Sequence, residues 1–558
     1  MITGVVVIAG LLAACASGIV TPAPPPEPVA SLPFQLPPQA ELKASPKKVF
    51  AHYLPTFPIS LDNKEPQLDY YDTDYLNPMG EDGRHAAYGG LLRDRPLPQS
   101  PLSAAAWQLD NMKTEVRRAT EAGLDGFTVD VPSLEGDAWD RVNLLFNAAP
   151  SVDPDFALVL MPDTSGEDIN VNALADAMTI LAKSPAAFRL ADGRVVISPF
   201  YPERLGPAYW RTFLALMSDH GVDVAFVPCF LDYPTNADVF SDISYGFSSW
   251  GNRSPAANQD IASSIHDSHA RGKIWMQPVA VQDERPNQGV YDEANNSENL
   301  RVSWRAAIDT DADWVQLATW NDYSENTQVS PSAHLGWAPL DISSYYLTRF
   351  KTGAWPAIVR DVVYVSYRIQ PAAARATEGQ TTLMHLRPGS SPARDKLEVL
   401  SFLTSPATIE ADVGGAAHSY PAPAGVNAQL FDLNAGSHSV LATRNGQTMV
   451  SVASQVPTTL TSTVQNLEYF YISSGRTGPS APRQTQPDPK PGAAWPVRTG
   501  QVTEVAPSVV GVGPRRHARE RLRQDGLGWA RPGVVATLGL RVAADARCDG
   551  TSTQRSGQ

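Results

Sequence analysis

The sequence predicts an α/β fold in which a (β/α)8 TIM barrel is followed by an all-β sandwich. From residue 47 to about 358, short apolar runs alternate with segments of helical periodicity, which is typical of parallel strands covered by helices on both faces. The alternation gives eight strand candidates, which is the number in such a barrel. Beyond residue 358, short runs separated by Gly, Pro, Asn and Ser favour antiparallel sheets.

The eight apolar runs are short and rich in Val, Ile, Phe and Trp, so we expect strands at 48–54, 126–131, 156–162, 194–200, 224–230, 243–249, 273–279 and 314–320. The segments between them predict helices at 103–125, 137–149, 171–184, 207–221, 257–272, 296–309 and 341–353. In the first helix Trp107, Met112 and Val116 fall near one face, and Gly123 marks its end. An open doubly wound sheet is the alternative, but no G-x-G-x-x-G follows a strand to support it.

Composition limits the partners and the redox chemistry. The chain has 558 residues and a net charge of −14, which argues against a nucleic-acid partner, because phosphate binding needs a basic face. The three cysteines, Cys15, Cys229 and Cys548, are too far apart in sequence to suggest a disulfide framework or a C-x-x-C metal site. Cys229 lies in an apolar run and is expected to be a core thiol.

The two ends of the chain differ from the rest. Residues 1–21 read as a secretory or lipoprotein signal, in which "LAAC" would make Cys15 the lipidated residue of a secreted or cell-envelope bacterial lipoprotein anchored to the membrane. A plain signal peptide or a misassigned start is the alternative. Residues 22–46 are proline-rich and predict a linker, and residues 476–558 predict a disordered tail. The barrel would span 47–358 and the sandwich 359–475.

Polar and aromatic side chains follow the ends of the predicted strands, where the active sites of TIM barrels lie. Aromatic rings stack on sugar faces, and carboxylates and amides bind sugar hydroxyls, so this mixture predicts a carbohydrate site. The residues expected to bind substrate are His52, Tyr53, Asp130, Asp163, Tyr201, Trp250, Gln277, Trp320 and Asn321. The long first loop, Pro55 to Leu102, carries three aspartates and three tyrosines and is expected to form a wall of the cleft.

Asp322 and Glu325 follow the eighth strand and supply the two carboxyl groups that glycosidic cleavage needs. The alternative is that one of them only caps a turn. No cofactor is required, because an acid, a base and water suffice. No metal is expected: His266 and His269 lack an H-E-x-x-H context, and Asp69, Asp72 and Asp74 lack a full calcium-loop pattern.

Several of these segments, "KKVFAHYLP", "AGLDGFTVDV", "LVLMPDTS", "LATWNDYSENTQVSP" and "HLGWAPLD", resemble glycoside hydrolase family 71, the α-1,3-glucanases or mutanases, in a match over roughly residues 47–355. The resemblance implies a barrel followed by a sandwich and hydrolysis of α-1,3-glucan with inversion by Asp322 and Glu325. Glu325 is expected to be the acid and Asp322 the base. The family motif has Gly and Ser where this chain has Ser324 and Asn326. A glycosidase for another linkage, such as an α-mannoside, and a non-catalytic polysaccharide-binding surface lipoprotein are the alternatives.

Overall fold

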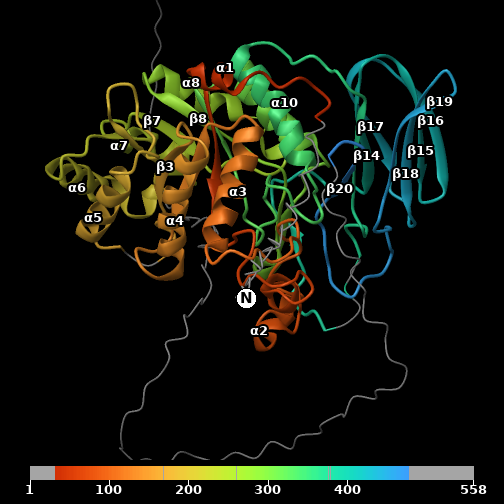
Figure 1. The fold of residues 1–558 in the computed structure, drawn as a ribbon, viewed down its shortest axis with the longest axis horizontal. Helices are drawn as coiled ribbons and strands as arrows, with labels where there is room; N and C mark the ends of the chain where they lie inside the picture. The colour runs from red at the N-terminus through yellow and green to blue at the C-terminus, as the bar shows by residue number, and fades with distance from the viewer. Residues whose placement is uncertain (1–31, 167–168, 259, 375, 377–378, 477–558) are drawn as a thin grey trace, which may run out of the picture.

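The computed structural model describes residues 32–166, 169–258, 260–374, 376 and 379–476 (Figure 1). The expected signal segment with Cys15, the first part of the linker and the tail beyond residue 476 lie outside the described residues. Within those ranges, no helix is both long and apolar enough to cross a membrane.

A curled sheet of parallel strands forms the larger part of the molecule, in a TIM-barrel-like arrangement. Its strands are β1 Lys48–Tyr53, β2 Gly126–Val131, β3 Ala157–Pro162, β4 Val195–Ile197, β5 Val224–Phe226, β6 Cys229–Phe230, β7 Gly246–Ser249, β8 Ile274–Val279 and β11 Trp314–Leu317. They pair in the order β5-β4-β3-β2-β1-β11-β8-β7-β6. The two ends of this order, β5 and β6, are consecutive in the chain and are separated only by Val227 and Pro228. All eight predicted strands are therefore present.

Helices cover the outside of this sheet, as Figure 1 shows. They are α3 Trp107–Glu121, α4 Gly136–Val152, α5 Val171–Ala182, α6 Gly206–Asp219, α7 Tyr233–Phe240, α8 Ile261–Ala270, α9 Glu298–Asp309 and α10 Ala338–Thr352, with short 3-10 turns η3 Pro202–Arg204 and η4 Ala256–Asn258. The seven predicted helices are confirmed. Helix α7 was missed, because it has only eight residues and begins with Pro at its first turn.

Alternation along the strands divides side chains between the helix layer and the interior of the curled sheet. One interior layer contains Phe50, Val159, Val196, Ala225, Val227, Met276 and Trp314. A second apolar layer lies toward the carboxyl ends of the strands and contains Met161, Phe200, Cys229, Trp250 and Ala318. Burial raises the pKa of the Cys229 thiol to about 12, as expected for an inert core cysteine. The interior is thus packed, and only its carboxyl-terminal end can present polar groups to a ligand.

The expected linker differs from the structure in its described part. Residues 39–44 form helix α1 (Gln39–Ala44), and Leu42 is fully buried against the main core. Phe34 is buried too and lies edge-on to Tyr345 of α10, with ring centroids 5.3 Å apart. The apolar residues among the prolines bury enough surface to fix this segment, which composition alone did not reveal.

The first loop is ordered around a core of its own. It contains the π-helix η1 Tyr71–Tyr75, helix α2 Gly80–Gly83 and the 3-10 turn η2 Ala86–Tyr88. Phe57, Tyr71, Tyr75 and Leu92 pack with Tyr323, which lies between Asp322 and Glu325 in the chain. The loop therefore supports the segment that carries the predicted acid and base.

Two four-stranded antiparallel sheets form the β-rich part, drawn in cyan and blue in Figure 1. The first has the order β17-β14-β12-β20 and the second β16-β15-β18-β19. The strands are β12 Val362–Tyr367, β14 Lys396–Leu403, β15 Ala407–Val413, β16 Ala416–Ala422, β17 Gly425–Asp432, β18 His438–Arg444, β19 Gln447–Ala453 and β20 Phe470–Ser473. A further short strand, β13 His385–Leu386, pairs with β10 Val290–Asp292 next to β9 Asp283–Arg285, which is followed by η5 Pro286–Gln288.

In the first of these sheets, the two central strands β12 and β14 are buried on both faces. In β12, Val363 and Val365 face the second sheet, whereas Val362 and Tyr364 join the core around the barrel helices. A buried ion pair crosses the same junction: Nε of Arg476 donates to Oδ1 of Asp341 at 2.8 Å, and Tyr364 donates to Oδ2 at 3.0 Å.

The substitution Arg476→Met is expected to lower the free energy of unfolding by about 3–5 kcal/mol, because it leaves the Asp341 carboxylate buried without its cation. Urea unfolding of the purified chain measures it. The matched control is Lys396→Met, whose partner Asp432 is exposed, and its cost should stay within about 1 kcal/mol. Equal effects of the two substitutions would contradict the proposed role of the buried pair.

Candidate active site

Asp322 lies in a tight turn just beyond β11. Its Oδ1 accepts hydrogen bonds from the backbone N–H of Ser324 at 2.9 Å, the Ser324 hydroxyl at 2.6 Å and the N–H of Glu325 at 3.2 Å. These hydrogen bonds all reach Oδ1, so Oδ2 is the oxygen available for other chemistry. Asp322 therefore caps the turn, as one sequence interpretation expected, and capping does not consume the whole carboxyl group.

Three carboxyl groups meet at this end of the barrel. Burial raises the pKa of Asp130 well above its usual range, and repulsion from Asp163 and Asp322 raises it further. The pKa values of Asp163 and Asp322 are also raised, in both cases chiefly by burial. Asp130 lies in β2 and Asp163 directly follows β3, at positions where alternation points side chains into the interior of the curled sheet, whereas Asp322 lies in the turn beyond β11. The arrangement can hold a proton among the three groups.

His52 completes this cluster from β1. Its Nε2 lies 3.9 Å from Oδ1 of Asp130, and its Nδ1 lies 3.0 Å from the sulfur of Met161. Burial, assisted by the positive charge of Arg253, lowers the pKa of His52 to about 3. The imidazole is therefore neutral at ordinary pH and acts as a hydrogen-bonding group rather than as a cation.

Glu325 is buried beside Arg285. Nη1 of Arg285 lies 2.6 Å from Oε1 of Glu325, and both residues are buried. Among the described residues, neither oxygen of Glu325 accepts a hydrogen bond of normal geometry. Burial raises the pKa of Glu325 to about 8 and repulsion from Asp322 adds to this, while Arg285 opposes it. The carboxyl group is therefore protonated near neutral pH and can donate a proton.

Arg285 is itself held in place by a neighbour on β9. Its Nε donates to both oxygens of Asp283, at 2.8 and 2.9 Å, and its Nη2 donates to Oδ2 at 2.6 Å. Because this bidentate contact fixes the guanidinium plane, the cation is directed at Glu325 rather than free to swing away.

An aromatic wall stands beside the carboxylates. Trp250 lies edge-on to His52 and to Phe200, with ring centroids 4.9 and 4.7 Å apart. Arg253 lies over the Trp250 ring at 5.1 Å. Tyr201 packs against this cluster and has a left-handed backbone (φ 53°), which is rare for a bulky residue and marks a constrained position.

Five of the predicted substrate-binding residues lie together in this cluster, and four do not. Tyr53 and Trp320 face the helix layer: the Tyr53 hydroxyl donates to the sulfur of Met112, and Nε1 of Trp320 donates to Glu115 at 2.9 Å. Gln277 is fully buried and bonds Trp275, which belongs to the same layer. These three side chains therefore lie on the opposite face of their strands from the cluster, because one step along a strand reverses the face.

Asn321 also lies outside this cluster. Its amide donates to the carbonyl oxygens of Leu54 and Phe57 and its Oδ1 accepts from the N–H of Leu54, each at 2.8–2.9 Å. All these contacts tie the first loop to the segment after β11. The Asn321 side chain therefore holds these two segments together.

Sequence reasoning missed Arg253, Asp283 and Arg285. The signal was present in the charged run Asp283-Glu284-Arg285, which comes soon after β8, where barrel loops carry functional groups. Arg253 is buried, and its Nε and Nη2 have no hydrogen-bond partner among the described residues. A buried guanidinium with free donors next to carboxylates can bind the hydroxyls of a substrate.

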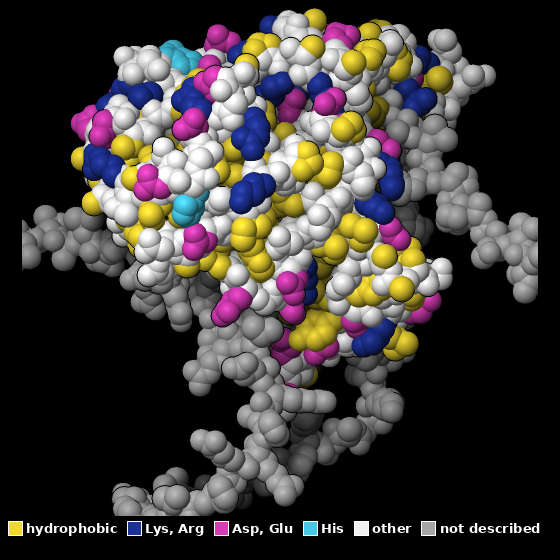
Figure 2. Space-filling view, turned by 60° about the vertical axis from the view of Figure 1, so that its left-hand side comes forward, with side chains coloured by type: hydrophobic (Ala, Val, Ile, Leu, Met, Phe, Trp, Pro, Cys, Tyr) yellow, Lys and Arg dark blue, Asp and Glu magenta, His cyan; other side chains and the backbone are white. Residues whose placement is uncertain are grey.

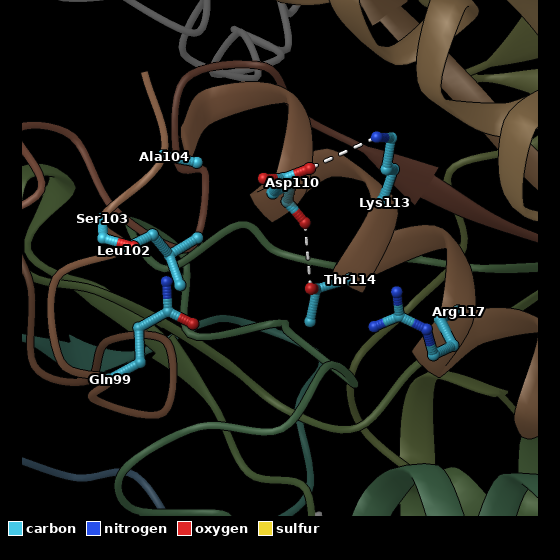
Figure 3. Close-up of a pocket in the computed structure, with 8 residues that line it drawn as sticks. All are labelled: Gln99, Leu102, Ser103, Ala104, Asp110, Lys113, Thr114 and Arg117. Atoms are coloured by element: carbon cyan, nitrogen blue, oxygen red, sulfur yellow. Dashed lines mark hydrogen bonds and ion pairs between the residues drawn. The ribbon is translucent and has the colours of Figure 1, made fainter. Parts of the chain in front are cut away.

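Three other features lie away from this site. A hollow of about 320 Å³ is lined by the start of α3 and the loop before it: Gln99, Leu102, Ser103, Ala104, Asp110, Lys113, Thr114 and Arg117 (Figure 3). It contains neither Asp322 nor Glu325. Figure 2 shows Lys, Arg, Asp and Glu side chains interspersed over one outer face of the molecule. His269 lies half-exposed on α8, paired with Asp313 at 2.8 Å, as expected for a solvated helix face.

A TIM-barrel-like sheet with paired carboxyl groups and an aromatic wall at the carboxyl ends of its strands is typical of carbohydrate-cleaving enzymes. The model of glycosyl hydrolase family 71 matches residues 102–482, more than half of the chain, and the chain belongs to this family. It is a glycoside hydrolase.

Named relatives agree with this assignment. The glucan endo-1,3-alpha-glucosidase agn1 of Schizosaccharomyces pombe is 24% identical over 377 residues, which is 62% of this chain and 86% of that protein. The mutanase Pc12g07500 of Penicillium rubens is 25% identical over 379 residues, 62% of this chain and 80% of that protein. Among solved structures, the GH99 endo-alpha-mannosidase from Bacteroides thetaiotaomicron is 15% identical and covers 55% of this chain and 95% of its own, with a TM-score of 0.41, a likeness too weak to define the fold.

Proposed function

We propose that the protein hydrolyses α-1,3-glucosidic bonds in an α-glucan with inversion of configuration, with Glu325 as general acid and Asp322 as general base. The observation that supports this most is the pair of neighbouring buried carboxyl groups of which one, Glu325, has a pKa near 8. An acid that is protonated at neutral pH is what the departing glycosidic oxygen needs. The similarity to the endo-1,3-alpha-glucosidase and mutanase supports the linkage.

In the proposed step, Glu325 gives its proton to the glycosidic oxygen as the bond to the anomeric carbon breaks. Oδ2 of Asp322 takes a proton from a water molecule, and that water attacks the anomeric carbon from the opposite face. An inverting enzyme places its two carboxyl groups about 6.5–9.5 Å apart in the working complex, so that the water fits between them. The acid ends ionised beside Arg285, which stabilises the new charge.

His52, Asp130, Asp163, Tyr201 and Trp250 are the groups that we propose to bind the sugar beside the cleaved bond, joined by Arg253. Trp250 and Tyr201 offer ring faces to the apolar side of the sugar, and the polar groups bond its hydroxyls. Neutral His52 and the proton-sharing carboxyl groups can donate as well as accept, which suits hydroxyl ligands.

The substrate is tested with a panel of α-1,3-glucan, other α-glucans, α-mannan and β-glucan, scored by release of reducing ends. We expect release from α-1,3-glucan. Proton NMR of the first product should show the β-anomer before mutarotation, because inversion converts an α-linkage into a β-product. Release from α-mannan alone would show that the enzyme cleaves a mannosidic linkage instead. A first product in the α-anomeric form would show that hydrolysis retains the configuration and does not invert it. Binding of α-glucan without release would support a non-catalytic binding protein.

We further propose that residues 47–358 form a closed (β/α)8 catalytic barrel and that residues 359–475 form a β-sandwich that braces it. The shared core of β12 and α10 supports the bracing role. Because residues 1–21 read as a lipoprotein signal, we also propose an extracellular enzyme of bacterial type, anchored through Cys15. Mass spectrometry of the mature N-terminus tests the anchor: a diacylglycerol on Cys15 is expected, and an unmodified N-terminus would contradict it.

A further inference from the structure

A second group of acidic side chains lies behind the segment that carries Asp322 and Glu325. Asp94, His334 and Glu468 each offer a ligand atom, and these atoms all lie within 4.8 Å of one another. They come from three parts of the chain: the first loop, the segment that follows the proposed catalytic turn, and the stretch before β20. His334 contacts Glu468 directly, and its Nδ1 lies 3.8 Å from Oδ1 of Asp94.

Two further oxygen-bearing side chains belong to this group. Glu284 of β9 reaches the same place, because its Oε1 accepts a hydrogen bond at 2.9 Å from the backbone N–H of Leu467, the residue before Glu468. Gln328 donates from Nε2 to Oδ2 of Asp94 at 2.9 Å, which fixes the orientation of its amide. We call Asp94, Glu284, Gln328, His334 and Glu468 the junction cluster.

The junction cluster has an excess of buried acceptor atoms. Within the described residues, Oε2 of Glu284, Oε2 of Glu468 and Oε1 of Gln328 have no hydrogen-bond partner. All three residues are at most 2% exposed. Leaving several acceptors without donors in a protein interior is costly, and every one of these atoms is an oxygen that binds cations.

Neither His334 nor Arg93 meets this need, because His334 contacts Oε1 of Glu468 and leaves Oε2 without a partner. Arg93 gives its hydrogen bonds to the carbonyl oxygens of Tyr88, Gly89, Gly90, Leu92 and Gln465. The unpartnered oxygens are therefore left for something else to bind. His334 is fixed by a stack on Phe470, with ring centroids 4.1 Å apart, so its imidazole stays in the cluster.

We propose that the junction cluster binds one divalent first-row transition-metal ion, of the class of Zn²⁺ or Mn²⁺, through Asp94, His334 and Glu468, with Glu284 and Gln328 completing the oxygen ligands. An imidazole nitrogen among carboxylate and amide oxygens suits these ions better than Ca²⁺ or Mg²⁺, which favour oxygen alone. The site is independent of the proposed substrate.

The ion would brace the proposed catalytic turn. The N–H of Glu284 donates to the carbonyl oxygen of Glu325 at 2.8 Å, and the amide of Asn326 donates to the carbonyl oxygen of Glu284 at 2.9 Å. On the other side, the N–H of Leu467 donates to Oε1 of Glu284 at 2.9 Å. A metal ion held here would therefore tie the first loop, β9, the catalytic segment and the β-rich part together.

The test is metal stoichiometry in the full chain. The purified protein is stripped with a chelator, dialysed separately against Zn²⁺, Mn²⁺ and Ca²⁺, and analysed by elemental mass spectrometry, with melting followed in parallel. We expect one Zn²⁺ or Mn²⁺ per chain and a melting temperature that rises with the concentration of that ion. Glu468→Gln should lose both effects. Asp313→Asn, which alters the surface pair with His269, is the matched control and should keep both.

A wild-type chain that retains no ion, or retains only Ca²⁺, would overturn the proposal. So would a Glu468→Gln variant that folds and still binds one ion per chain. If that variant does not fold, the visible absorption of Co²⁺ bound to the wild-type protein decides. Bands typical of bound imidazole and carboxylate support the site, and a spectrum of free aqueous Co²⁺ contradicts it. None of these measurements uses a glucan, so they stand apart from the proposed hydrolase activity.

Discussion

Asp322→Asn and Glu325→Gln are each expected to lower kcat on α-1,3-glucan by at least about 10²–10⁴-fold, the usual contribution of general acid–base catalysis. Asn at position 322 keeps an oxygen that can accept the hydrogen bonds from Ser324 and Glu325, so the turn should survive. Gln at position 325 keeps the shape of the buried side chain. Both variants should therefore still fold and bind glucan.

Turnover is measured as reducing ends released, and binding by co-sedimentation with insoluble glucan. Asp313→Asn, a surface carboxylate variant, is the control and should leave both unchanged. If Asp322→Asn keeps kcat within tenfold of the wild-type value, then Asp322 only caps its turn. The base would have to be sought in Asp130 or Asp163, which share the same cluster.

The fold could be predicted from the sequence because the spacing of apolar residues and the turn residues that end each element are local signals. Each parallel strand is a run of apolar residues buried on both faces, and each main helix repeats its apolar residues at helical spacing. Helix α7 and strand β16 lack these signals. Helix α7 is short, and β16 has no continuous run of buried apolar residues, because partly buried and exposed residues alternate along most of its length. The described part of the linker was misjudged because proline content says little about the few apolar residues between the prolines.

The sequence identified the strands that reach the site but not which of their side chains face it, and the reason is strand geometry. His52 and Tyr53 are neighbours in β1, yet His52 faces the carboxylates and Tyr53 faces α3. Residue type does not reveal which of two adjacent positions points inward, because both are buried. Arg253 reaches the site from a loop and Arg285 from the short strand β9, both in segments whose paths are set by tertiary contacts, and no periodic pattern in the sequence encodes such a path.

The substitution Arg285→Gln is expected to move the alkaline limb of the pH profile of kcat/KM upward. In the wild-type protein this limb should lie near pH 8, because activity is lost when Glu325 gives up its proton. The Arg285 cation favours the ionised form of Glu325. Removing it raises the pKa of Glu325, by about 1–3 units for the loss of an adjacent opposite charge. The acid then stays protonated to higher pH.

Arg285→Gln should also lower kcat at neutral pH. Glu325 then holds its proton more tightly, and after proton transfer its carboxylate lacks the Arg285 cation that stabilises it. Arg285→Lys should restore part of kcat and return the limb toward the wild-type position. Arg387→Gln is the matched control, since Arg387 lies 3.5 Å from Asp283 and its pairs are with Asp283 and Asp292 rather than with Glu325. If the alkaline limb of the pH profile does not move in Arg285→Gln, then it does not reflect the ionisation of Glu325. The acid would then have to be another of the buried carboxyl groups.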